Sequence, residues 1–148
     1  LFKIVCRTSP LTIEKNRYWH IRRTLDLKKM KQGAQYLIGK HDFTTFRSTL
    51  CQAKSPVKSI DKIEILKINS FIGASIHVKF EARSFLHNQI RSIIGTLEKV
   101  GANNWSPEQV QLALFAKNRS ECGPVAPAYG LYLTKIDYGD DVFEKERG

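Results

Sequence analysis

The clearest hydrophobic pattern in the chain lies in residues 83–101. Apolar side chains recur there every three or four positions, the spacing of a helix with one buried face: Leu86, Ile90, Ile93, Ile94, Leu97 and Val100. Ser84 is a residue type that caps the first turn of a helix, and Gly101 is typical of a helix end. The pattern predicts that this helix is the element around which the fold is organised.

The opposite face of this predicted helix carries His87, Arg91 and Gly95, which follow one another at intervals of four residues. Glycine destabilises a helix interior by about 1 kcal/mol relative to alanine, so we expect Gly95 to leave room that a neighbouring group needs. A cation beside such a gap, early on an otherwise buried helix, needs a functional or structural explanation.

Other hydrophobic periods predict two further helices and several strands. One helix has Asp26 as its cap and Gly39 as its end. Another begins with a capping-box pattern formed by Ser106, Pro107 and Gln109. Strand patterns occur at residues 2–6, 60–68, 74–82 and 131–138.

The two middle strands are separated by a turn at residues 69–73, which predicts an antiparallel hairpin leading directly into the central helix. The first of them is apolar on both faces in part, as in a strand covered on both sides. Segments 8–18, 39–58 and 118–128 are expected to be loops. Strands and helices mix without a βαβ rhythm, which predicts an α+β domain: an antiparallel sheet with helices packed on one face.

The length of 148 residues is typical of one domain, which we place at residues 1–139, followed by a charged tail at residues 140–148. No apolar stretch is long enough to span a membrane, and no signal peptide is recognisable, so we expect a soluble, cytoplasmic protein without membrane contacts. Cys6, Cys51 and Cys122 are widely spaced, which fits reduced thiols better than disulfides or a zinc site. Leu1 opens directly into a strand pattern, as in a piece of a longer protein.

The distribution of charge points to a polyanionic partner. The chain has a formal net charge of +10. Residues 1–67 contain 15 basic and 5 acidic side chains, whereas residues 68–148 contain nine of each, so the whole excess lies in the first half. Nucleic acid is the partner that such an asymmetry favours, against a merely solvated basic surface.

Motifs for nucleotide, metal and serine chemistry are absent from the sequence. The four histidines lack the spacing of metal ligands, and the pair His41 and Asp42 has no neighbours that would complete a metal site, so no metal is expected. Arg91 has two interpretations on physical grounds. It is an unpaired surface cation, or its planar guanidinium fixes a carboxylate or phosphate, and no carboxylate of the chain is an obvious partner.

Three segments narrow this choice because they resemble one known family. Residues 39–47 read Gly-Lys-His-Asp-Phe-Thr-Thr-Phe-Arg, residues 85–95 read Phe-Leu-His-Asn-Gln-Ile-Arg-Ser-Ile-Ile-Gly, and residues 126–133 read Ala-Pro-Ala-Tyr-Gly-Leu-Tyr-Leu. Each is similar to a motif of the TruA family of tRNA pseudouridine synthases. The three occur in family order with compatible spacing and span most of the chain.

The resemblance implies a cofactor-free enzyme that isomerises uridine to pseudouridine in the anticodon stem-loop of tRNA, at positions 38, 39 and/or 40. It implies two related α+β domains around a cleft, with a catalytic aspartate in the N-terminal domain, and a homodimer. The family's Arg-Thr-Asp-x-Gly-Val-His motif is absent from residues 1–148. This chain would then be the C-terminal domain, inactive alone, with residues 1–23 near the junction to the missing N-terminal domain.

Site residues follow from the same resemblance. Arg91 matches the arginine that pairs with the catalytic aspartate across the cleft. Candidates for lining the uridine pocket or supporting its wall are Phe43, Phe46, Phe85 and Leu131, and His87 is a further candidate for binding the substrate or the RNA. Candidates for the RNA path are Arg47 and Lys54, followed by Trp19, Arg22 and Arg23. Two other classes of function stay open: a non-catalytic RNA-binding module of similar architecture, and a basic protein-interaction domain.

Overall fold

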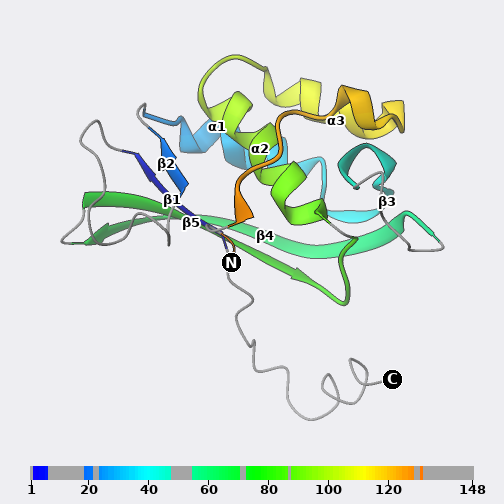
Figure 1. Ribbon diagram of the computed structural model, residues 1–148, viewed down its shortest axis with the longest axis horizontal. Helices are drawn as coiled ribbons and strands as arrows, with labels where there is room; N and C mark the ends of the chain where they lie inside the picture. Colours follow the sequence, from blue (N-terminus) through cyan, green and yellow to red (C-terminus); the bar gives the residue numbers. More distant parts are fainter. Residues whose placement is uncertain are drawn as a thin grey trace, which may run out of the picture.

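A five-stranded sheet forms the base of the computed structural model, which describes residues 2–6, 19–21, 24–47, 55–70, 73–86, 88–128 and 131 (Figure 1). The strands lie in the order β2-β1-β5-β4-β3. Their bounds are Phe2–Cys6 for β1, Trp19–Ile21 for β2, Gly39–Asp42 for β3, Val57–Ser70 for β4 and Gly73–Ala82 for β5. Only the pair β1 and β2 is parallel among the described strands.

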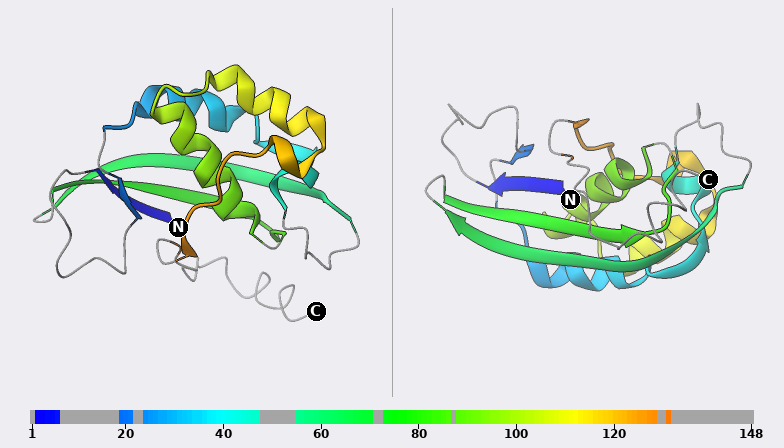
Figure 2. Two further views of the ribbon diagram at one scale, coloured as in Figure 1. Left: turned by 45° about the horizontal axis from the view of Figure 1, so that its top comes forward. Right: turned by 90° about the horizontal axis from the view of Figure 1, so that it is seen from below.

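All three described α-helices cover the same face of this sheet, and the turned views agree (Figures 1 and 2). They are α1 (Leu27–Gln35), α2 (Gln89–Gly101) and α3 (Pro107–Ala116). Short 3-10 helices lie at Thr44–Phe46 (η1) and Arg119–Glu121 (η2). The α+β architecture with helices on one face confirms the sequence-based prediction, and no helix in the described part of the chain is long and apolar enough to cross a membrane.

The predicted hairpin of β4 and β5 is confirmed by an antiparallel register that pairs Ile65 with Val78. A β-bulge between Ile60 and Lys62 shifts the alternation, so Ile60 and Ile63 both face the helices although they are three residues apart. The expectation that β4 is covered on both sides is wrong. The bulge brings the buried apolar residues on either side of it to the helix side of the sheet, and the face away from the helices carries charged side chains.

Helix α2 is the centre of the core, as predicted, and its whole apolar stripe is buried. Its start differs from the prediction. Ser84 is exposed and does not cap the helix, which begins at Gln89 after Asn88, a residue with a left-handed φ of 61°. The chain needs residues 83–88 to turn from the end of β5 back across the sheet, so the hydrophobic periodicity began earlier than the helix itself.

Two other boundaries were also predicted wrongly. Helix α1 is capped by Asp26 as expected, but it ends at Gln35, and Gly39 begins β3 with a φ of +102° that favours glycine. The segment predicted as a loop at residues 39–58 contains β3, η1 and the first residues of β4. The capping box of α3, with Ser106 and Gln109, is confirmed. Predictions for residues 8–18 and 132–148 lie outside the described residues.

Candidate active site

Arg91 lies in the first turn of α2, where the chain segment 122–128 crosses the helix. Its guanidinium Nε donates a hydrogen bond to the carbonyl oxygen of Ala126 at 2.7 Å. Its Nη1 donates to Oδ1 of Asn88 at 3.0 Å. The backbone completes the arrangement, because the amide of Ala126 donates to the carbonyl oxygen of Arg91 at 3.0 Å. The arginine is thereby held by both sides of the helix entrance.

This anchoring leaves part of the guanidinium available. An arginine has five N–H donors, and Nε and Nη1 each use one of them here. Nη2 donates to none of the described residues, and no described carboxylate forms an ion pair with Arg91. The side chain is half-buried, so its unused donors are both oriented and accessible. A planar cation in this state is suited to bind a carboxylate or phosphate from another molecule or domain.

Gly95 explains how segment 122–128 approaches so closely. A Cβ atom at Gly95 would lie 1.4 Å from the carbonyl oxygen of Pro124, so no larger residue fits without displacing the segment. At the next residue, the hydroxyl of Thr96 accepts a hydrogen bond from the amide of Gly123 at 3.1 Å. The expectation that a neighbouring group needs the space at Gly95 is confirmed. Gly95 and Ala126 together set the position of Arg91.

The first family-like segment, residues 39–47, is mostly structural. Its two aromatic residues, Phe43 and Phe46, are both 0% exposed and lie in the core with their ring centroids 6.5 Å apart. Nε2 of His41 hydrogen-bonds the carbonyl oxygen of Ile38 at 2.9 Å. Thr45, also fully buried, donates its hydroxyl to the carbonyl oxygen of Ala113 at 2.6 Å. The Thr45 hydrogen bond joins η1 to α3.

Asp42 caps the turn into η1. Its Oδ1 accepts from the amide of Thr44 at 2.9 Å and from the Thr44 hydroxyl. The hydroxyl hydrogen bond is the main cause that holds the pKa of Asp42 below its ordinary value, against the opposing effect of burial. The Thr44 amide and the positive charges of Lys117 and Arg47 act in the same direction as the hydroxyl. Asp42 is therefore an ionised structural acceptor, and the described residues contain no cluster of three metal-binding side chains.

The other predicted site residues are placed less closely together. Phe85 is half-buried, with its ring at 6.2 Å from that of Phe80, and Leu131 packs partly against the core. Arg47 is half-buried directly after η1. Lys54, His87, Arg22 and Arg23 lie outside the residues whose side chains are described, and Trp19 is half-buried in β2.

Two partners of Arg91 were missed from the sequence. Asn88 contributes a side-chain oxygen, and Ala126 contributes only its backbone. The contact with Ala126 carries no side-chain signal, although Gly95 did indicate that some segment lies close.

The class that this fold and site define is an α+β domain with one helical layer on its sheet and an oriented arginine at the start of the central helix. Comparison with known proteins identifies the family. A family model described as tRNA pseudouridine synthase matches residues 34–139. This chain belongs to that family, which confirms the resemblance of its three motifs.

Curated relatives agree with the family model. The chain is 50% identical over 147 residues to tRNA pseudouridine synthase A of Ruegeria sp. (strain TM1040), covering 99% of this chain and 57% of the relative. It is 51% identical over 140 residues to tRNA pseudouridine synthase A of Caulobacter vibrioides (strain NA1000 / CB15N), covering 95% of this chain and 55% of the relative. The chain therefore spans about half the length of the curated relatives that it matches.

Proposed function

We propose that this chain is one part of a tRNA pseudouridine synthase, and that it supplies Arg91 to the active site. The observation that carries the proposal is the state of the guanidinium: fixed by Asn88 and Ala126, half-buried, and without a carboxylate partner among the described residues. An arginine held in this way is prepared for a partner that the rest of the protein provides. The matching partner is the catalytic aspartate that the family's motifs imply.

The proposed reaction is an isomerisation, so no atom is gained or lost overall. The aspartate carboxylate attacks the bound nucleotide, the N-glycosidic bond breaks, and the detached uracil turns and rejoins the ribose through carbon. The bond to the carboxylate breaks as the new carbon–carbon bond is completed, that ring carbon then loses its proton, and the ring nitrogen that left the ribose takes one up. Arg91 acts by orienting the carboxylate with its remaining donors, and its positive charge keeps the carboxylate ionised. No metal or cofactor takes part.

The proposed substrate is the anticodon stem-loop of tRNA, with uridines 38, 39 and/or 40 as targets. A base in that stem must leave its stack to reach a carboxylate, at a cost of a few kcal/mol. Arg47 and Lys54 are proposed phosphate contacts along this path. Phe85 and Leu131, which are partly exposed, are proposed to face the base, whereas the buried Phe43 and Phe46 support the wall behind it. A homodimer in the cytoplasm remains a prediction from the resemblance.

A replacement chimera tests the proposal. In it, this chain takes the place of the segment that it matches in the Ruegeria relative. The chimera and the isolated chain are each incubated with unmodified tRNA, and pseudouridine is quantified by mass spectrometry, with the unaltered relative as the positive control. We expect turnover by the chimera and none by the isolated chain. A folded but inactive chimera, or an active isolated chain, contradicts the proposal.

The alternative of a non-catalytic RNA-binding module is supported by one observation, the concentration of the net charge in residues 1–67. Both functions require tRNA binding that weakens steeply with salt. Each phosphate contact on a duplex adds about 0.9 to the slope of log affinity against log salt concentration. Only the synthase function requires that the chimera forms pseudouridine. Tight binding with no turnover therefore favours the alternative, whereas salt-insensitive binding favours a protein-interaction domain.

A further inference from the structure

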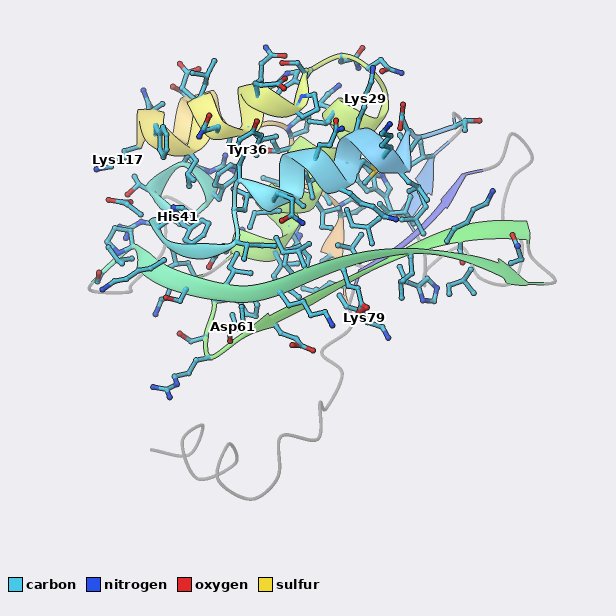
Figure 3. All side chains as sticks on the ribbon, turned by 180° about the vertical axis from the view of Figure 1, so that it is seen from behind. Lys29, Tyr36, His41, Asp61, Lys79 and Lys117 are labelled. Carbon is cyan, nitrogen blue, oxygen red and sulfur yellow. The ribbon has the colours of Figure 1, made fainter. Side chains whose placement is uncertain are left out.

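A groove of about 450 Å³ lies at the rim of the sheet, where β3 and β4 begin and β5 ends. Three cations line it, Lys40, Lys58 and Arg83, together with the hydroxyls of Ser59 and Ser84 and the carboxylate of Asp61. The Asp61 side chain lies on the side of the sheet away from the helices (Figure 3). The groove is therefore separate from the contacts that hold Arg91.

The strand register brings these cations together. Lys40 of β3 is opposite Ser59 of β4, and the next pair is His41 opposite Lys58. Ile60 is in turn opposite Ala82, the last residue of β5, so Arg83 emerges beside the start of β4. Three segments far apart in the sequence thus each contribute one positive charge to the same rim.

None of the described carboxylates neutralises these charges. Nζ of Lys58 donates to the hydroxyl oxygen of Ser84 at 3.1 Å, a neutral partner. Among the described residues, no carboxylate forms an ion pair with Lys40, Lys58 or Arg83, although Asp61 lies in the same groove. Further along the sheet the pattern is different, because Lys62 is opposite Glu81 and Glu64 is opposite Lys79. At the rim three cations thus share a groove with one carboxylate, whereas basic and acidic residues face each other further along the hairpin.

We propose that this groove binds the sugar–phosphate backbone of the same RNA molecule that places a nucleotide at Arg91. Lysine, arginine and serine side chains are the usual donors to phosphate oxygens. The carboxylate of Asp61 is an acceptor for a ribose 2′-hydroxyl, which DNA lacks. This inference rests on the proposed function and adds a second contact surface to it.

The chain connection makes one continuous path possible. Arg91 follows Arg83 by eight positions, and an extended chain rises at most about 3.5 Å per residue, so their Cα atoms lie within about 28 Å of each other. A stem-loop with one nucleotide at Arg91 can extend its backbone over that distance. The groove is then a positioning surface, and it contributes to binding rather than to the chemical step.

The test compares two triple variants of the full chain that carry the same change of charge. The groove variant is Lys40→Gln, Lys58→Gln, Arg83→Gln. The control variant is Lys28→Gln, Lys31→Gln, Lys67→Gln, which removes three cations that are exposed elsewhere. Affinity for an unmodified tRNA transcript is measured over a salt series, and thermal unfolding checks that both variants fold.

We expect the groove variant to bind at least about tenfold more weakly, with a salt slope reduced by about 2 to 3 because three phosphate contacts are lost. The control variant is expected to stay within about threefold of the wild-type affinity. Equal losses in the two variants, or no loss in the groove variant, overturn the inference. In the replacement chimera the groove variant should raise KM and leave kcat within about twofold, which separates this inference from the proposed role of Arg91.

A second measurement addresses Asp61. The ratio of affinities for an RNA stem-loop and a DNA stem-loop of the same sequence is determined for wild type and for Asp61→Ala. We expect the preference for RNA to fall by about fivefold or more, although the loss of a negative charge strengthens binding to both. An unchanged ratio overturns the assignment of Asp61. If the wild type itself does not bind tRNA, the proposed function fails together with the groove.

Discussion

Two of the three segments that resemble the family's motifs, residues 39–47 and residues 85–95, differ in what their polar side chains do. In the first, Asp42, His41 and Thr45 all use their polar atoms within the fold. In the second, Arg91 is held by two hydrogen bonds at a half-buried position and keeps donors that no described residue uses. Similarity to a family motif therefore identifies both structural and chemical residues, and only the contacts separate them.

The difference has a physical cause. Residues 39–47 form the corner where an edge strand meets α3, and a corner needs satisfied polar groups because buried unpaired ones are costly. In the second segment, another part of the chain crosses the start of α2, so the guanidinium of Arg91 is fixed without being neutralised by any described carboxylate. Predictions that disturb one segment and spare the other test this distinction.

The largest effect on stability is expected from Phe46→Ala in the structural segment. Phe46 is 0% exposed, so its removal leaves a cavity and should lower the free energy of unfolding by about 3 to 5 kcal/mol. Phe115→Ala is the matched control, because Phe115 on α3 is 61% exposed and should cost less than about 1 kcal/mol. Denaturant unfolding measures both. A similar loss for the two variants would contradict the core assignment of Phe46.

A somewhat smaller effect is expected from Gly95→Ala in the second segment. The new Cβ overlaps the carbonyl oxygen of Pro124, and displacing this backbone should cost about 3 kcal/mol. It should also shift Ala126 and so loosen Arg91. Gly33→Ala in α1 is the control, because its Cβ meets only side chains, at 3.1 Å or more, and gains helix propensity. An unchanged stability of Gly95→Ala would mean that segment 122–128 does not cross α2 as described.

The smallest effect is expected from Asp42→Asn, and it depends on pH. The pKa of Asp42 in the folded state lies below its ordinary value of 3.8. Its ionised form therefore stabilises the fold above that value, and the contribution is lost as the pH falls through the lower folded pKa. At neutral pH the free energy of unfolding of the variant should be lower than that of the wild type by less than about 1 kcal/mol.

The pH dependence itself provides the check on Asp42. Unfolding midpoints from about pH 6 to about pH 2 should fall less steeply for Asp42→Asn than for wild type. If the two curves have the same slope, the hydrogen bonds from Thr44 do not lower the pKa of this carboxyl group.

Much of the fold follows from the sequence because its periodic elements are long. The hairpin of β4 and β5 and the buried stripe of α2 each repeat over many residues, so single exceptions do not obscure them. Strand β3 was missed because four residues at a sheet edge carry no alternation of apolar side chains. The start of α2 was missed because Leu86 is buried before the helix begins, and burial imitates helical periodicity.

The candidate site was predictable only in part. Arg91 and Gly95 could be selected by their residue types at helical spacing. The role of Ala126 could not, because it acts through backbone atoms, and backbone contacts leave no side-chain signature in the sequence. The groove at Lys40, Lys58 and Arg83 likewise depends on strand register, which residue patterns alone specify weakly.

The central claim is that Arg91, which has no carboxylate partner among the described residues, binds and orients the catalytic carboxylate. The most direct measurement is pseudouridine formation by the replacement chimera, compared with its Arg91→Ala, Arg91→Lys and Lys99→Ala variants. Lys99 is the control, a half-buried cation in the last turn of the same helix. We expect Arg91→Ala to lower kcat by about a hundredfold or more with tRNA affinity within about threefold of wild type, Arg91→Lys to recover little, and Lys99→Ala to remain active. Full activity of folded Arg91→Ala would contradict the account.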